Sequence, residues 1–172
     1  MKILITGAPG TGKTSISKIL SQLMKIQYFD IKKIINSHPE VVERIECKEK
    51  IINPLLKKIL AKELPKDYII DTHLIEYAPK TDVTVILRCN PIILRKRLEK
   101  RKYSKKKIRE NLEVEVIDYF TQLTKNDKVI EYNTSKNTIK ENAEKIKNKI
   151  IKKEYSKGSI QWTKKEYFTM LK

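Results

Sequence analysis

GAPGTGKT, at residues 7–14, is the stretch that decides the fold this sequence predicts. It fits the spacing G-x-x-x-x-G-K-[ST] of a phosphate-binding loop, or P-loop. The whole chain contains only four glycines, and three of them, Gly7, Gly10 and Gly12, lie in this stretch. In a sequence so poor in glycine, this clustering indicates a loop whose backbone adopts positive φ angles or approaches a ligand closely.

The sequence on both sides of the loop has the context that a P-loop needs. Residues 2–6 are a short apolar run typical of a buried strand, and an amphipathic helical pattern follows the loop. An ordinary glycine turn that caps a helix is the alternative, which the strand–loop–helix order disfavours. Backbone N–H groups of such a loop hold the β- and γ-phosphates of ATP. We expect Lys13 to contact those phosphates, the Thr14 hydroxyl to bind Mg²⁺ and Ser15 to bond the α-phosphate.

Apolar runs and helical patterns alternate along the rest of the chain. Four more short runs predict strands, at residues 28–30, 68–70, 83–87 and 128–132. Helical patterns lie between and after them, in pieces over 31–66 and then at 91–100, 105–125 and 138–153. Nearly continuous apolar strands that alternate with helices predict a parallel sheet covered on both faces. We therefore expect one α/β domain over residues 1–172, with three α/β/α layers, a parallel five-stranded sheet, and an extension at 154–172 that either packs back or frays.

Length and composition limit the class of protein. With 172 residues, 40% hydrophobic and 34% charged, the chain can bury one core and is neither disordered nor collagen-like. Cys47 and Cys89 are far apart and match no metal-ligand spacing. Because no apolar run approaches the length of a membrane span, we expect a cytoplasmic protein without a membrane partner.

The net charge of +17 indicates an anionic partner, unless the lysines merely keep the surface solvated. The arginines help to separate these interpretations. Five of the six lie between Arg88 and Arg109, a window that holds eleven basic residues and one acid, Glu99. Arginine offers phosphate a rigid bidentate fork that lysine lacks. We therefore expect the arginines of this window to grip nucleotide phosphates, and the lysines elsewhere to be mainly surface residues.

The third apolar run ends in Asp71-Thr72-His73. An acid at the carboxyl end of a strand beside a P-loop is expected to hold a metal, so Thr14 and Asp71 are the predicted Mg²⁺ ligands. A turn or helix-capping aspartate is the alternative. His73, two residues on, is predicted to orient water or substrate, and a structural histidine is the alternative.

Arg97 and Arg101 are four residues apart, so they project from one face of a helix. Phosphoryl transfer needs positive groups around the oxygens of the moving phosphoryl group. For the lysines at 105–107, a solvated helix surface is the better interpretation. The predicted catalytic residues are Lys13, Asp71, His73, Arg97 and Arg101.

Together these elements resemble one branch of the nucleoside monophosphate kinases. The resemblance rests on the P-loop and on residues 71–73 (DTH), 87–88 (LR), 97–103 (RLEKRKY) and 110–115 (ENLEVE). Over residues 1–150 the sequence is similar to the adenylate kinase isoenzyme six family, which comprises the coilin-interacting kinase of eukaryotes and its archaeal relatives.

The resemblance implies a P-loop kinase sheet with a monophosphate-binding insert at about 30–53 and a short lid at about 100–110. It also places the ATP contacts of the family on residues of the P-loop, the lid and a loop near adenine. These are Gly10, Gly12, Lys13, Thr14, Ser15, Arg101, Lys136 and Asn137.

The chain departs from the family pattern where the acceptor would bind. Lys32-Lys33 stands in place of Gly-Asp, and Asn36 lies near the position of an expected arginine. Arg44, the only arginine of the insert, could replace it. In the lid, Arg101-Lys102-Tyr103 replaces Arg-Gly-Tyr. The preferred monophosphate therefore stays open, with AMP favoured.

The resemblance implies an enzyme that uses ATP and Mg²⁺ to phosphorylate a nucleoside monophosphate and that also hydrolyses ATP. It further implies a role in late maturation of the small ribosomal subunit, with a small-subunit ribosomal protein and pre-ribosomal RNA as partners. A second hypothesis is an ATPase that acts mainly as a switch on pre-ribosomal particles. A third, more distant hypothesis is a kinase of the same sheet that phosphorylates a hydroxyl group of a small molecule.

Overall fold

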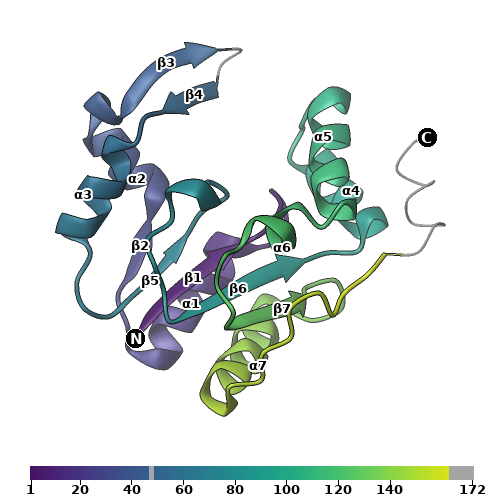
Figure 1. Ribbon diagram of the computed structural model, residues 1–172. Coiled ribbons are helices and arrows are strands. Elements are labelled where there is room, and N and C mark those ends of the chain that lie inside the picture. The colour runs from purple at the N-terminus through teal and green to yellow at the C-terminus, as the bar shows by residue number, and fades with distance from the viewer. Residues whose placement is uncertain (47–48, 163–172) are drawn as a thin grey trace.

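The computed structural model describes residues 1–46 and 49–162, and within them five strands form one parallel sheet. Its strands are β1 (Lys2–Thr6), β2 (Tyr28–Asp30), β5 (Tyr68–Asp71), β6 (Val83–Arg88) and β7 (Val129–Asn133). Their order in the sheet is β2-β5-β1-β6-β7, so β1 lies in the middle (Figure 1). All five predicted strands are confirmed to within one residue at each end.

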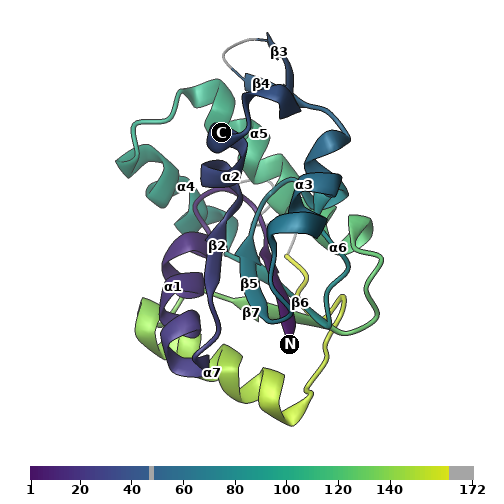
Figure 2. The same cartoon turned by 90° about the vertical axis from the view of Figure 1, so that its left-hand side faces the viewer.

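Alternate side chains of each strand pack on opposite faces of the sheet. Ile3 and Ile5 of β1 join a core cluster with α1 (Lys13–Met24) and α7 (Ile139–Lys152). Leu4, between them, belongs to a second cluster with α3 (Leu55–Glu63). Figure 2 shows α1 and α7 on one side of the sheet and α3 on the other. The predicted three-layer α/β/α architecture is confirmed.

Three more helices cover the β6–β7 half of the second face. They are α4 (Pro91–Lys100), α5 (Lys105–Val116) and α6 (Tyr119–Leu123). Leu94, Leu98, Leu112 and Phe120 pack there against Ile86 of β6. Asn90 caps α4, because its side-chain oxygen accepts a hydrogen bond from the N–H of Ile92 (3.0 Å). Pro91, the next residue, suits the first turn of a helix.

The predicted helical pieces at 31–66 are wrong in their middle part. This region contains α2 (Ile31–Ser37), a 3₁₀ turn (Pro39–Val41) and an antiparallel hairpin of β3 (Val42–Glu46) and β4 (Glu49–Ile52) before α3. β3 is mainly exposed, so it lacks the alternation of apolar and polar residues that reveals a half-buried strand. We call residues 31–46 and 49–52 the arm, whose hairpin of β3 and β4 stands away from the sheet (Figure 1).

The predicted helix at 105–125 is in fact two helices. The chain breaks at Asp118, whose φ of 56° is left-handed, and α6 starts at the next residue. The Asp118 side chain accepts a hydrogen bond from Arg88 Nη2. This long-range contact accompanies the break, and no glycine or proline signals it in the sequence.

The described part of the extension packs back on the sheet. The Ser156 N–H donates to the carbonyl oxygen of Val129 (2.7 Å), and Ser156 forms a parallel bridge with Ile130. The rest of the predicted extension, residues 163–172, lies outside the described residues. In the part of the chain that the structure describes, no helix combines the length and apolarity needed to cross a membrane.

Candidate active site

The P-loop connects the central strand β1 to α1, and its glycines are required by packing and backbone angles. A Cβ atom on Gly7 would lie 2.3 Å from the backbone oxygen of Leu87, so only glycine lets the loop pack against β6. Gly12 has a φ of 100° and starts α1 without a side-chain cap among the described residues. The first N–H groups of α1 are therefore available to an anion.

Lys13 lies over the loop. Its Nζ donates to the carbonyl oxygens of Gly7 (2.7 Å) and Ala8 (3.0 Å). Desolvation of the ammonium group lowers the pKa of Lys13 to about 8, although the Asp71 carboxylate opposes this shift. A phosphate in the loop would favour the charged form, since an opposite charge nearby raises the pKa of an amine.

Asp71 is buried at the end of β5, next to β1 in the sheet. Its two oxygens accept hydrogen bonds from the Thr14 hydroxyl (2.8 Å) and the Tyr28 hydroxyl (2.6 Å). Burial and the bond to Asp71 raise the pKa of Tyr28. The structure thus brings together the two predicted metal ligands, and it adds Tyr28, which no sequence motif singles out.

The oxygen donors Thr14 and Asp71 fit Mg²⁺, which prefers a few protein oxygens together with phosphate oxygens. Among the described residues, no group of three or more His, Cys, Asp or Glu side chains could hold a metal ion.

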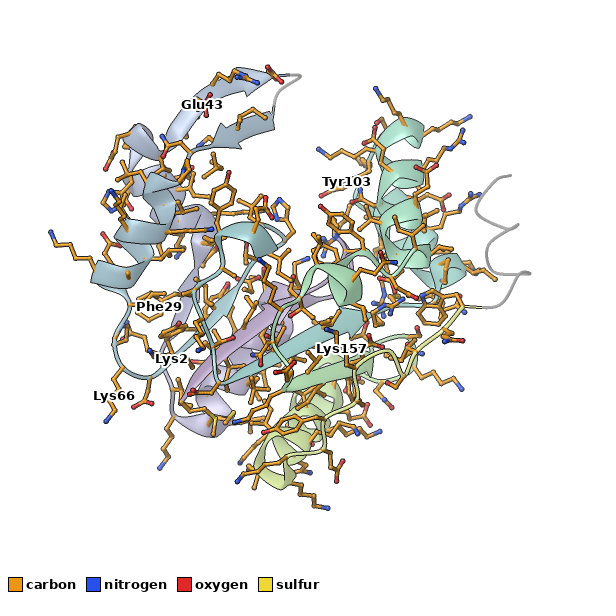
Figure 3. All side chains as sticks on the ribbon, viewed as in Figure 1. Lys2, Phe29, Glu43, Lys66, Tyr103 and Lys157 are labelled. Carbon is orange, nitrogen blue, oxygen red and sulfur yellow. The ribbon has the colours of Figure 1, made fainter. Side chains whose placement is uncertain are left out.

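A cleft of about 790 Å³ opens above the P-loop. One wall comes from the arm, with Lys32, Asn36 and Lys50. The opposite wall comes from the α4–α5 connection and from α5 and α6. Figure 3 shows Tyr103 on this second side, across from the hairpin that carries Glu43.

The comparisons with known proteins agree with this geometry. The chain matches a family model described as an AAA domain over residues 3–118. It is 35% identical over 175 residues to a protein of Methanocaldococcus jannaschii named "Putative adenylate kinase", covering 99% of this chain and 97% of that protein. A protein of the same name from Methanosarcina acetivorans is 34% identical over 183 residues, covering 94% of this chain and 97% of the relative. The chain belongs to this family of P-loop kinases.

A solved structure supports the fold of this kinase. Shikimate kinase from Bacteroides thetaiotaomicron superposes with a TM-score of 0.65 at 17% identity, covering 88% of this chain and 98% of that one. At such low identity the likeness concerns the architecture alone. The predicted P-loop kinase type of sheet is thus confirmed.

The predicted catalytic residues of the kinase do not all lie in the cleft. His73 is exposed and lines the cleft beside Asp71, and Arg101 lines it at the C-terminal end of α4. Arg97 is absent from the described residues that line the cleft. Its guanidinium donates to the hydroxyl (3.2 Å) and the carbonyl oxygen (2.7 Å) of Thr134. A catalytic role for Arg97 stays a prediction, and the observed contacts join α4 to the loop after β7.

The loop after β7 carries Lys136 and Asn137. The Asn137 side chain donates to the Tyr132 hydroxyl (3.5 Å) and accepts from Lys145 Nζ (3.3 Å). Neither residue is among those that line the described cleft. Their contact with adenine stays a prediction.

The prediction that Arg88 grips a nucleotide is wrong. Arg88 is 2% exposed, and its guanidinium pairs with Glu115 (2.7 Å), Asp118 and Glu131 (3.7 Å). These carboxylates neutralise its charge within the protein. The acids lie well away from Arg88 in the sequence, which is why the local count of charges is misleading.

Arg44 is absent from the described residues that line the cleft. It lies exposed on the hairpin and pairs with Glu43 (3.4 Å) and Glu46 (2.6 Å). The arm instead directs Lys32 and Lys50 into the cleft. Lys50 lies on a strand that the sequence pattern did not reveal, so the sequence carried no signal for its position.

Proposed function

We propose that this kinase transfers the γ-phosphoryl group of ATP to a nucleoside monophosphate, with AMP as the favoured acceptor and Mg²⁺ as the cofactor. The observation that carries the proposal is the single cleft that extends from the P-loop to the lysines of the arm. One cavity thus offers anion-binding groups at two places, as a reaction between two phosphate esters requires. The name shared by the two archaeal relatives supports the same acceptor class.

The donor phosphates would lie in the P-loop. The N–H groups of the loop and of the first turn of α1 would bind the β- and γ-phosphates, and Ser15 the α-phosphate. Lys13 would exchange its carbonyl partners for phosphate oxygens. Arg101 would approach the same phosphates from the opposite wall.

Thr14 and Asp71 would hold Mg²⁺, which would supply positive charge to neutralise the phosphates of the nucleotide. The Tyr28 hydroxyl holds one oxygen of Asp71, which leaves the other oxygen beside Thr14. This arrangement orients the carboxylate before a nucleotide binds, because both of its oxygens have fixed partners.

The acceptor phosphate would bind at Lys32 and Lys50 of the arm. Lys50 Nζ donates to the Asn36 side-chain oxygen (2.8 Å), so the amide orients the ammonium group within the cleft. Two lysines would then replace the arginine that the resemblance leads one to expect. Because an ammonium is a compact charge without a bidentate fork, this site would select for charge more than for phosphate geometry.

The reaction breaks the bond between the γ-phosphorus and the β–γ bridging oxygen, and it forms a bond from an oxygen of the acceptor phosphate to that phosphorus. The products are ADP and a nucleoside diphosphate. Both the attacking and the leaving oxygens are anionic, so no proton has to be transferred. Lys13 and Arg101 would stabilise the charge in the transition state, and His73 would orient the acceptor or a water molecule.

A coupled assay tests the proposal. Purified protein with ATP and Mg²⁺ is offered AMP, CMP, UMP or GMP, and nucleoside diphosphates are separated and quantified. We expect the highest kcat/KM with AMP, and lower acceptor affinity in Lys32→Met and Lys50→Met than in the matched variant Lys33→Met. The absence of a diphosphate product with all four acceptors would refute the proposal, and phosphorylation of a hydroxyl compound instead would favour the third hypothesis.

The short lid favours ATP hydrolysis as a second activity. Only residues 101–104 separate α4 from α5, and His73 is exposed at the cleft. We propose that such a lid excludes water incompletely, so that the enzyme also acts as an ATPase. The high positive charge of the chain is compatible with pre-ribosomal RNA and a small-subunit ribosomal protein as partners.

The ribosomal role has a separate test. Pull-downs at several salt concentrations should recover small-subunit protein or RNA, and ATP turnover should change when that partner is added. Salt has to be varied because phosphate contacts weaken steeply as it rises. Unchanged turnover together with no recovery at moderate salt would exclude this role and leave the kinase activity.

A further inference from the structure

A group of mostly buried charged residues includes Glu115 of α5 and Asp118 at the start of α6, the two helices that also line the cleft. We call Arg88, Glu115, Asp118 and Glu131 the Arg88 cluster. Arg88 Nε donates to the Glu115 carboxylate (2.7 Å), and Arg88 Nη2 donates to the Glu115 carbonyl oxygen (3.0 Å). Arg88, Glu115 and Glu131 are each at most 3% exposed. Buried charges persist only when they are paired and bonded, so these contacts restrict the cluster to one arrangement.

The chain after α7 completes this cluster. We call residues 156–162 the C-terminal strap, which runs beside β7 (Figures 1 and 3). The N–H groups of Gly158 and Ile160 donate to the two oxygens of Glu131, each at 3.0 Å. Arg88 Nη1 donates to the Ile160 carbonyl oxygen (3.3 Å). The strap thus supplies partners to both the cation and an acid of the cluster.

Trp162 joins the strap directly to α5. Its indole N–H donates to Glu115 Oε1 (3.0 Å), and its ring centre lies 5.6 Å from Arg88 Cζ. A guanidinium over an aromatic face at this distance is a cation–π contact. The same Glu115 oxygen accepts from Arg88 and from the Cys89 N–H (3.3 Å), so three donors hold it.

The helices that carry the cluster also form the wall. α5 presents Asn111 and Val114 to the cleft, and Glu115 is the next residue. Asp118 lies at the break before α6, and Tyr119 and Phe120, immediately after it, line the cleft. A change in the position of Glu115 or Asp118 therefore moves residues that line the cleft.

We propose that the C-terminal strap positions the α5–α6 wall of the nucleotide cleft, with Trp162 and Arg88 as positioning residues. The inference rests on the proposed function only in taking the ligand of the cleft to be a nucleotide. Coupling of this kind is reciprocal: if the strap favours the wall conformation that binds nucleotide, then nucleotide must stabilise the strap. Trp162 is the only tryptophan of the chain, so its fluorescence reports on the strap alone.

The first experiment uses the unmodified protein. Acrylamide quenching of Trp162 is measured with and without the β,γ-imido analogue of ATP and Mg²⁺, while calorimetry on the same samples measures binding. We expect the quenching constant to fall as the analogue saturates the protein. Binding in the calorimeter without a change in quenching would overturn the positioning role and leave the proposed function. No binding in the calorimeter would refute both.

The second experiment uses Trp162→Phe, which keeps an aromatic ring over Arg88 and removes the N–H that bonds Glu115. We expect the Kd of the ATP analogue to rise about fivefold, at the low end of allosteric couplings. Amide hydrogen exchange should also accelerate across residues 105–123.

The matched control is Ile146→Val, which loses packing on the opposite face of the sheet. It should lower the unfolding temperature without changing the Kd or the exchange of α5 and α6. If both variants change the Kd equally, or if Trp162→Phe binds the analogue like the unmodified protein, the strap has only a structural role and the proposal fails.

Discussion

Lys13 and Arg88 belong to two charged clusters at the carboxyl ends of the neighbouring strands β1 and β6. Lys13 donates to the neutral carbonyl groups of its own loop and faces the cleft. Arg88 faces three carboxylates and is almost completely enclosed. The first cation keeps its charge available to a ligand, whereas the charge of the second is neutralised by the protein.

The difference shows what decides whether a cation binds phosphate. Burial alone does not, since both side chains lose much of their hydration. The identity of the partners does: carbonyl oxygens can be exchanged for phosphate oxygens at little cost, but separating Arg88 from its acids would leave buried charges unpaired. A window rich in arginine therefore predicts a phosphate site only where acids from elsewhere in the chain do not reach it.

The largest expected effect is on stability, in Arg88→Met. This change leaves Glu115 and Glu131 buried without their cation, and removal of one partner of a buried pair costs about 3–5 kcal/mol. Urea unfolding followed by circular dichroism would measure the loss. A loss below about 1 kcal/mol would mean that the carboxylates do not hold Arg88 in a strong internal ion network. Arg88 would then resemble Lys13, whose charge is available to a ligand.

The variant Lys13→Met should lose activity and keep its stability, which is the opposite of the change expected for Arg88→Met. Loss of a preorganised charge at the reacting phosphates should lower kcat by about 10²–10³-fold. The free energy of unfolding should stay nearly unchanged or rise slightly, because a desolvated ammonium group is removed. Steady-state kinetics and urea unfolding on the same preparation provide the check. A fall in stability as large as that of Arg88→Met would break the comparison.

Glu115→Gln tests the electrostatics of the Arg88 cluster through pH. Burial raises the pKa of Glu115 to about 7 in the folded protein, from an ordinary value of 4.5, against the opposing effect of Arg88. The folded state then binds a proton more readily than the unfolded state. Stability from this group is present below pH 4.5 and is lost as the pH rises through about 7, by an amount on the order of 3 kcal/mol.

Unfolding free energies of the two proteins at several pH values between 4.5 and 8 isolate this contribution. The difference between them should change with pH in that window, since glutamine does not titrate there. Parallel pH profiles would show that Glu115 stays ionised throughout, as expected if its three hydrogen-bond donors outweigh its burial.

The smallest effect is expected for Arg109→Ala. Arg109 belongs to the same arginine-rich window, but it is 66% exposed and pairs with Glu113 one helical turn away (3.0 Å). Such a pair contributes less than about 0.5 kcal/mol. We expect kcat/KM to stay within about twofold of the unmodified protein, because losing so weak a pair changes little. A large rise in the KM for ATP would restore the phosphate-binding interpretation for this arginine.

The parts of the molecule that could be predicted from sequence depend on local chemistry. The P-loop needs glycine at positions of positive φ and close packing, and the strands of the parallel sheet need short apolar runs, so both leave a local signature. Asp71 follows from its place at the end of such a run. The hairpin of the arm could not be predicted, because an exposed strand such as β3 has no apolar alternation.

The sequence by itself determined the P-loop and the parallel sheet around it. It also identified Thr14 and Asp71, the two residues whose side chains meet beside the P-loop. Only the tertiary structure decided which of the many cations face the cleft. Lys32 and Lys50 face it, whereas Arg88 is enclosed by its acids and Arg97 bonds the loop at Thr134. The physical reason is that backbone conformation depends on neighbouring residues, whereas the effective charge of a side chain depends on partners brought close by folding.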